Sequence, residues 1–158
     1  MTTSIRSTLP PLVEVQPHID TESPAVLADA TQIHQVVLNL CTNAWHALPP
    51  RGGRITVALE PWTVTAGQVV AHRDLRAGPA VRLTVADDGC GMDAATLEHI
   101  FEPFFTTKQT GETTKQTGEG TGLGLAVVHG IVRSHAGAIV VRSAVGAGAT
   151  FELYFPAI

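Results

Sequence analysis

Val85-Ala86-Asp87-Asp88-Gly89-Cys90-Gly91-Met92 is the stretch of sequence that most constrains the fold. It continues an alternation of apolar residues at Val81, Leu83 and Val85, which predicts a β-strand with one buried face. The strand then ends in an acidic pair and two glycines. Glycines at such a junction let the backbone approach a flat ligand closely, and a carboxylate there can accept a hydrogen bond from the exocyclic amine of adenine. A plain glycine turn after a strand is the alternative interpretation.

Residues 29–47 have the pattern of an amphipathic helix that begins at the N-cap residue Asp29. Asn39 and Asn43 lie four residues apart on it, so both carboxamides project from one face, with His46 roughly a turn later. Carboxamide oxygens can ligate Mg²⁺, which proteins usually share with phosphates. Two asparagines on a helix also fit a simple solvated face.

The stretch Gly118-Glu119-Gly120-Thr121-Gly122-Leu123-Gly124-Leu125 opens directly into a second helix, predicted over 122–135. Alternating glycines leave backbone N–H groups free, and a helix N-terminus adds positive potential, so this segment is typical of a phosphate cradle. Its spacing matches neither the Walker A motif nor the dinucleotide-binding motif. A flexible hinge is the alternative.

Between these elements, residues 100–108 contain three phenylalanines beside a polar segment. The pattern indicates the anchor of a lid over a nucleotide, or else simple core filling. Residues 106–112, TTKQTGE, recur letter for letter at 113–119 and contain no apolar residue, which excludes a coiled coil. The repeat lengthens a polar lid predicted over 101–121. Lys108 keeps its spacing to Phe105 and Lys115 keeps its spacing to Gly120, so the lysine that faces the phosphates stays undecided.

The remaining periodicity predicts short strands, a short helix and a long loop. We expect strands over 13–19, 54–60, 80–86, 138–143 and 149–155, a helix from Asp93 to about Ile100, and a loop over 61–79. Pro17 confines the first strand to a sheet edge. This order predicts an α/β two-layer sandwich in which three helices cover one face of a mixed, mostly antiparallel β-sheet. Residues 1–12 are predicted to be a linker remnant, and 13–158 a single domain.

Composition excludes several classes of protein. The chain has 158 residues, 44% of them hydrophobic, and a net charge of −4, so it is expected to be globular and to bind neither nucleic acid nor anionic lipid. Cys41 and Cys90 lie far apart, which indicates neither a disulfide framework nor a zinc site. The apolar stretches are too short to span a membrane. We therefore expect a cytoplasmic domain without membrane contact.

Four segments, in this order, resemble the sequence boxes of sensor histidine kinases. Asn39–Ala44 resembles the N box, Asp87–Met92 the G1 box, Phe101–Phe104 the F box and Gly120–Leu125 the G2 box. The resemblance extends from about Leu12 to Pro156. It implies the GHKL ATPase fold, ATP and Mg²⁺ as cofactors, and the function of a catalytic ATP-binding domain.

The resemblance also implies roles for individual residues. Asn43 is the expected Mg²⁺ ligand and Asn39 its phosphate-side partner, which makes these two the catalytic residues. Asp87 is expected to read adenine above a floor formed by Gly89 and Gly91. The remaining expected nucleotide contacts are His46, Ala47, Met92, Lys108, Lys115, Gly120, Thr121, Gly122, Leu123, Gly124, Leu125 and Thr150.

The same resemblance implies the type of reaction. Gyrase-like and chaperone-like members of the superfamily activate water with a glutamate in the N-box helix, and this chain has Asn39 there, which cannot act as a base. Transfer to a supplied nucleophile is therefore favoured over hydrolysis. None of the seven histidines is followed by an acidic residue as in the family's phosphoacceptor motif.

The expected partners are therefore a separate histidine-bearing dimerisation domain and a downstream response regulator. The chain itself is expected to be a monomer, or a weak or lid-swapped dimer. Two alternatives remain at this stage: a nucleotide-binding regulatory module whose lengthened lid impairs transfer, and a serine kinase of the anti-sigma type.

Overall fold

The computed structural model describes residues 9–105 and 123–158. The elements in chain order are β1 (Val13–Ile19), α2 (Ala30–Ala47), β2 (Gly53–Val64), α3 (Ala66–Ala71), β3 (Gly78–Asp87), α4 (Ala94–Leu97), α5 (Gly124–Ser134), β4 (Ala138–Ser143) and β5 (Ala149–Pro156). No helix in these two ranges combines the length and the apolar character needed to cross a bilayer.

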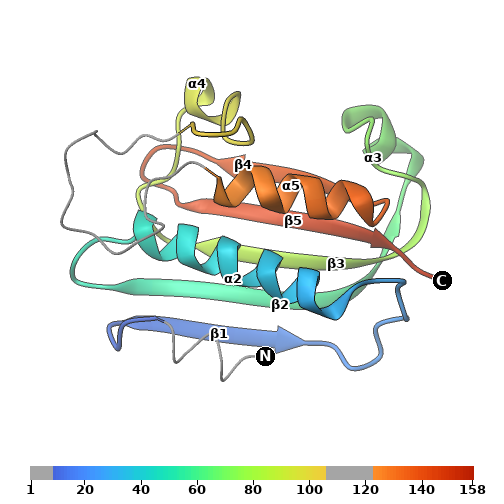
Figure 1. The fold of residues 1–158 in the computed structure, drawn as a ribbon, viewed down its shortest axis with the longest axis horizontal. Helices are drawn as coiled ribbons and strands as arrows, with labels where there is room; N and C mark the ends of the chain where they lie inside the picture. Colours follow the sequence, from blue (N-terminus) through green and yellow to red (C-terminus); the bar gives the residue numbers. More distant parts are fainter. Residues whose placement is uncertain (1–8, 106–122) are drawn as a thin grey trace.

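The five strands form one mixed sheet in the order β1-β2-β3-β5-β4 (Figure 1). β1 runs parallel to β2, and the other three pairings are antiparallel. Pro17 lies in β1 at the edge of the sheet, where a missing N–H removes no bond to a further strand. The predicted α/β sandwich with a mixed, mostly antiparallel sheet is confirmed, as is the edge position of the first strand.

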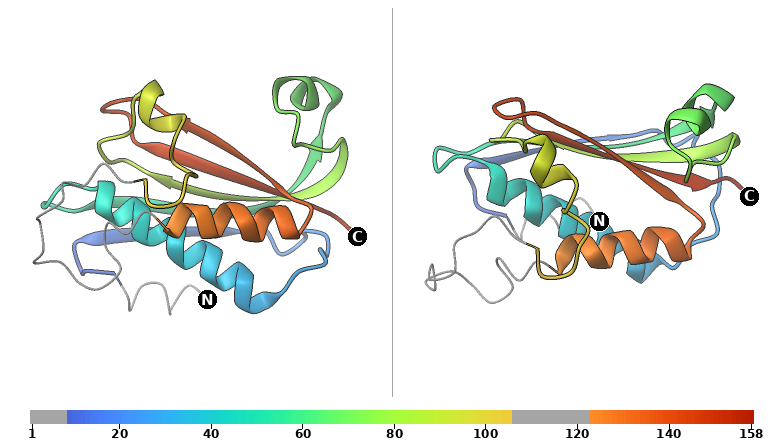
Figure 2. Two further views of the ribbon diagram at one scale, coloured as in Figure 1. Left: turned by 45° about the horizontal axis from the view of Figure 1, so that its top comes forward. Right: turned by 90° about the horizontal axis from the view of Figure 1, so that it is seen from above.

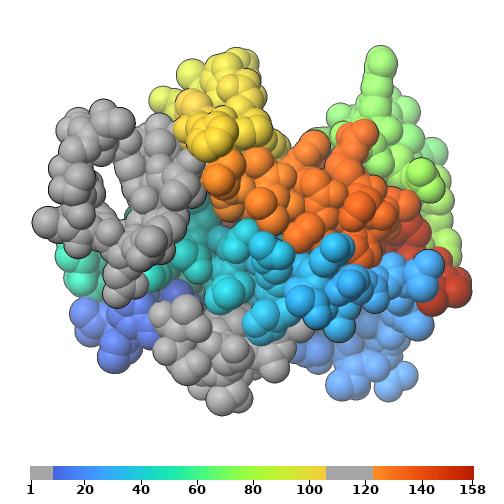
Figure 3. Space-filling model, viewed as in Figure 1, coloured from blue at the N-terminus to red at the C-terminus, as the bar shows by residue number. Residues whose placement is uncertain are grey.

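Helices α2 and α5 lie side by side across one face of the sheet (Figure 3). Leu97 and Ile100, in α4 and just after it, pack against the same core, so α4 lies on this side as well (Figure 2). The most deeply buried side chains come from α2, from α5 and from the facing side of the sheet. They are Val36, Val37, Leu40, Cys41, Ile55, Val85, Val128, Val132 and Leu153.

A histidine fastens the two long helices together. The backbone N–H of Asp29, the N-cap of α2, donates to Nε2 of His135 at the end of α5 (3.0 Å). The other ring nitrogen, Nδ1, lies 2.7 Å from the Ile131 carbonyl oxygen, so the proton of a neutral ring belongs on Nδ1. The Asp29 side chain accepts from Gln32 N–H, which confirms the predicted N-cap.

The structure corrects the loop predicted over 61–79. β2 continues through Pro61 to Val64, because Pro61 lies beyond Leu59, the last residue of β2 that pairs with β1. Helix α3 then begins at a capping box, in which the Thr65 side chain accepts from the Gln68 N–H and the Gln68 side chain accepts from the Thr65 N–H. The helix predicted from Asp93 to Ile100 is also shorter than expected and ends at Leu97.

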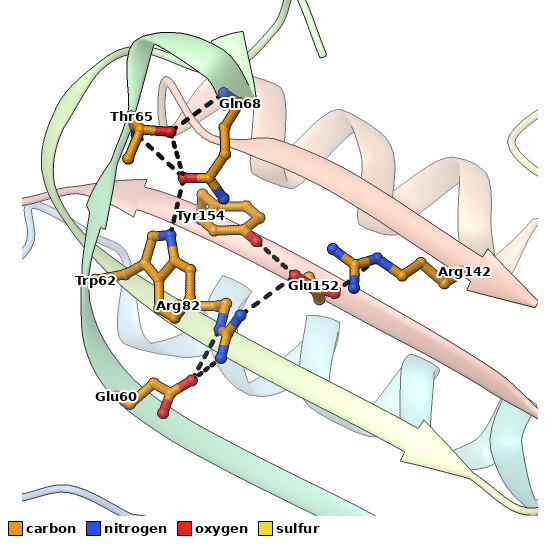
Figure 4. A network of polar contacts seen from close by, with 8 residues as sticks. All are labelled: Glu60, Trp62, Thr65, Gln68, Arg82, Arg142, Glu152 and Tyr154. Carbon is orange, nitrogen blue, oxygen red and sulfur yellow. Dashed lines mark hydrogen bonds and ion pairs between the residues drawn. The ribbon is translucent and has the colours of Figure 1, made fainter. Parts of the chain in front are cut away.

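The sheet face opposite α2 carries a second, smaller cluster and a polar network. Glu152, 4% exposed, accepts from the Tyr154 hydroxyl and pairs with Arg82 and Arg142. Arg82 also pairs with Glu60 and stacks over the Trp62 ring at 3.7 Å. Figure 4 shows the whole network, which comprises Glu60, Trp62, Thr65, Gln68, Arg82, Arg142, Glu152 and Tyr154. The bond from Trp62 Nε1 to Gln68 ties α3 to this face.

The N-terminal segment contributes a side chain to the main core. Leu9 falls in the segment 1–12 predicted to be a linker, yet its side chain is 8% exposed and packs in the main core.

Cys41 is a buried free thiol, and burial raises its pKa to about 11. Cys90 is a free thiol on the surface.

Replacing the core residue Leu153 with alanine should lower the free energy of unfolding by about 2–5 kcal/mol, since its side chain is fully buried and the cavity cannot close completely. Urea denaturation measures the change. Leu27→Ala is the control, because Leu27 is 85% exposed and its truncation should change stability by less than about 0.5 kcal/mol. Equal effects of the two substitutions would contradict the assignment of the core.

Candidate functional site

Three segments that the sequence singled out meet at one end of the sandwich. The C-terminal half of α2, the N-terminus of α5 and the end of β3 all lie at the left of the view in Figure 1. Asn39 and Gly124 are 85 positions apart in sequence, yet Asn39 Nδ2 donates to the Gly124 carbonyl oxygen at 3.3 Å. The structure therefore brings together the helix with the two asparagines and the helix that follows the glycine-rich segment.

The half-buried side chains of α2 line this end of the helix. Asn39, Asn43 and His46 are each partly exposed, and the His46 ring lies against Trp45 with 4.9 Å between ring centroids. Asn43 follows Asn39 by about one turn, as its spacing predicted. In residues 9–105 and 123–158, no three His, Cys, Asp or Glu side chains gather as metal ligands. A metal ion here would depend on amide and phosphate oxygens.

Asp87 ends β3 and turns its carboxylate back onto the chain. The carboxylate oxygen Oδ1 accepts from Gly89 N–H at 2.8 Å, and the Ala149 N–H is a second backbone donor to this carboxyl. Burial raises the pKa of Asp87 above its ordinary value of 3.8. The two backbone hydrogen bonds partly offset this rise, and the neighbouring charge of Asp88 adds to it. The free protein thus holds this carboxylate at a net cost in stability.

The glycines after Asp87 are required by close contacts within the protein itself. A Cβ on Gly89 would lie 2.4 Å from the carbonyl oxygen of Ala47, at the end of α2. Gly91 has φ of +70°, and a Cβ there would lie 2.0 Å from the Ala144 carbonyl oxygen. The N–H of Cys90 donates to Ala47 O at 3.0 Å, so the turn is pinned against α2.

The register of the sheet places Thr150 one row away from Asp87. Asp87 pairs with Ala149 across β3 and β5, whereas Thr150 pairs with Ala86. Because side chains alternate between the faces of a strand, Thr150 shares a face with Glu152, opposite α2 and α5. Sequence reasoning missed Ala149, whose contribution is a backbone N–H and leaves no signal in the side chain.

The other expected contacts divide between the described and the remaining residues. Ala47 accepts from the glycine turn through its carbonyl, and Met92 and Leu125 pack against the core. Leu123 is the N-cap of α5 and makes no side-chain capping bond, while a Cβ on Gly124 would meet nothing within 4 Å. Most of the predicted lid lies outside the described residues. So do five expected contacts, which are Lys108, Lys115, Gly120, Thr121 and Gly122.

Sequence comparison finds a matching protein family and relatives that are named as sensor kinases. Residues 28–158 match the family described as "Histidine kinase-, DNA gyrase B-, and HSP90-like ATPase". The chain is 42% identical over 131 residues to the sensor kinase CckA of Brucella abortus, which covers 83% of this chain and 13% of CckA. It is 41% identical over 133 residues to the sensor histidine kinase ZraS of Escherichia coli K12, which covers 84% of this chain and 23% of ZraS. The chain thus spans less than a quarter of the length of either relative.

Solved structures agree with these relatives. The mycobacterial sensor histidine kinase MprB shares the fold with a TM-score of 0.70 at 24% identity, over 99% of this chain and 89% of that one. Full-length ShkA in complex with AMPPNP gives 0.70 at 25% identity, over 98% of this chain and 29% of that one. The catalytic domain of histidine kinase ThkA gives 0.66 at 27% identity, over 99% and 84%. The chain belongs to this ATPase family, and within it is a histidine kinase ATP-binding domain of the GHKL type.

Proposed function

We propose that this chain binds Mg²⁺-ATP between α2, α5 and the turn after β3, and that it donates the γ-phosphate to a histidine on a separate dimerisation domain. The observation that carries the proposal is the hydrogen bond from Asn39 to Gly124, which joins α2 and α5 at the end of the sandwich where β3 also ends. The names of the relatives and the nucleotide complex of a structural neighbour support it.

Asp87 is proposed to hold the adenine end of the nucleotide. Its Oδ1 is occupied by Gly89 N–H, and the carboxylate keeps further acceptor capacity for an exocyclic amine. Burial raises the pKa of Asp87 in the free protein, and a donor from a bound base would add a further hydrogen bond to the charged carboxylate. Such a bond would explain why a carboxylate stays at a half-buried position that lowers stability.

Asn43 and Asn39 are proposed to serve the phosphate end. Asn43 presents a hard carboxamide oxygen from a half-buried position, which fits an ion that takes few protein ligands and shares the phosphates. Bound Mg²⁺ would neutralise charge on the phosphate oxygens. The amide nitrogen of Asn39 donates to Gly124, and this bond holds α5 beside α2. The side-chain oxygen of Asn39 can therefore face the phosphates or the ion. Leu123, the N-cap residue of α5, makes no side-chain capping bond, and N–H groups at the start of a helix suit an anion.

The absence of a base at Asn39 favours transfer over hydrolysis. A carboxamide accepts no proton from water, so a nucleophile that attacks without first losing a proton is favoured. A neutral imidazole nitrogen of the partner would attack the γ-phosphorus, and the bond from that phosphorus to the bridging oxygen would break, releasing ADP. A response regulator would then receive the phosphoryl group. Because ATP is supplied in the cytoplasm, we place the domain there.

Nucleotide binding is tested by calorimetric titration with a non-hydrolysable ATP analogue and Mg²⁺. Asn43→Ala and Asp87→Asn should each weaken binding about tenfold or more, since each removes one contact with the ligand. The matched control is Asp74→Asn, because Asp74 is exposed and pairs with Arg133 at the other end of α5. Loss of binding in the control, or none by the folded parent chain, would contradict the proposed site.

The raised pKa of Asp87 predicts a pH dependence of stability. The folded chain binds a proton at Asp87 more tightly than the unfolded chain does, so its free energy of unfolding falls as pH rises from 3.8 through the raised pKa. Above that pKa the effect is constant. The free energy of unfolding of the parent chain minus that of Asp87→Asn should therefore decline as pH rises across this window. Urea denaturation at successive pH values measures this difference. A difference that increases with pH would show that the carboxylate is stabilised instead.

Phosphoryl transfer is tested with γ-labelled ATP and the histidine-bearing helical domain of a sensor histidine kinase. We expect label on that domain which is lost in acid and retained in base, as for phosphohistidine, and no label with Asn43→Ala. Acid-stable label on serine would identify a serine kinase. Tight nucleotide binding with no transfer would identify a regulatory module.

A further inference from the structure

Ser143 ends β4 in the same row of the sheet as Asp87. Ser143 pairs with Ala149 of β5, and Ala149 pairs with Asp87 of β3. Directly paired residues point to the same face, so Ser143 and Asp87 both face the side of α2 and α5. Only the alanine methyl group lies between them in this row.

The Ser143 hydroxyl makes two short hydrogen bonds that join two turns. It accepts from Met92 N–H at 2.8 Å, and it donates to the Gly148 carbonyl oxygen at 2.7 Å. One hydroxyl proton and one lone pair are thus both committed in defined directions. The hydroxyl holds the far end of the turn that starts at Asp87 against the turn between β4 and β5.

Backbone contacts make the same junction rigid. Gly146 N–H donates to the Cys90 carbonyl oxygen at 2.7 Å, and Gly91 leaves no room for a side chain beside Ala144. The turn after Asp87 is therefore fixed at Cys90 by backbone and at Met92 by a side chain. A shift of Met92 would move the segment that carries the Asp87 carboxylate relative to any base bound there.

We propose that Ser143 is a positioning residue for the turn Asp87–Met92, and that it sets the preference of the site for adenine over purines without the exocyclic amine. This inference rests on the proposed nucleotide-binding function. Ser143 is bonded to the turn at Met92, so its proposed effect is on where the turn holds Asp87. The specificity contributed by Asp87 depends on sub-ångström placement, because hydrogen bonds weaken steeply with distance and angle.

The experiment uses calorimetry to compare the binding of two nucleotides in the presence of Mg²⁺. One is a non-hydrolysable ATP analogue. The other carries the same non-hydrolysable triphosphate on purine riboside, which lacks the exocyclic amine. The parent chain should prefer the adenine nucleotide. Ser143→Ala should weaken adenine binding about tenfold and purine binding much less, so the ratio between them shrinks. Ser143→Thr keeps the hydroxyl and should retain the preference. Ser134→Ala is the matched control, since the hydrogen bonds of the Ser134 hydroxyl to described residues go to the Ile131 carbonyl of α5 and to the neighbouring His135.

A second measurement is independent of nucleotide. Amide hydrogen exchange at Met92 should be slow in the parent chain and in Ser143→Thr, and fast in Ser143→Ala. An unchanged adenine preference in Ser143→Ala, or equal loss for both nucleotides, overturns the positioning role while leaving nucleotide binding established. A folded parent chain that binds neither nucleotide overturns the proposed function, and this inference with it.

Discussion

Direct contact between backbones at the turn after β3 is the constraint on which the rest of the site depends. At Gly89 the chain passes so close to the last carbonyl of α2 that no side-chain carbon fits between them, and at Gly91 it does the same beside Ala144. Hydrogen bonds from Cys90 to Ala47 and from Gly146 to Cys90 close the arrangement on both sides. The positions of α2, of the β4–β5 turn and of the Asp87 carboxylate are therefore set together.

This constraint gives the glycines a different role from the one that their pattern indicates. From their pattern, Gly89 and Gly91 are expected to form a surface beneath a bound base, because glycine permits close approach of a ligand. In the structure the close approach is made by other parts of the same chain. The two roles are compatible, since a turn pressed firmly against its own scaffold offers a fixed surface to a ligand on its open side.

Sequence periodicity predicted most of the fold because each long element buries one continuous stripe. The apolar spacing in α2 and α5 and the alternation in β3 and β5 coincide with the buried residues. The failure at 61–79 has a local cause: Pro61 disguised the continuation of β2, and the capping box of Thr65 and Gln68 was present in the sequence but overlooked.

Contacts made across strands set the limit of prediction at the site. The resemblance names Thr150 as a nucleotide contact, and the register of β3 and β5 places Ala149, not Thr150, directly opposite Asp87. Ser143 carried no signal, because its two partners are backbone groups that become neighbours only when the sheet forms. Motif spacing identifies residues that face a ligand better than it identifies residues that hold them.

Pro17 has a consequence beyond the placement of β1. The outer side of an edge strand offers a row of donors and acceptors to any extended chain, including a strand of another copy. Pro17 has no backbone donor within this seven-residue strand, and proline on an edge strand is one of the features that oppose pairing with a further chain. The β1 edge of this sheet thus carries a feature that opposes edge-to-edge association, and it does so without a charged side chain at that position.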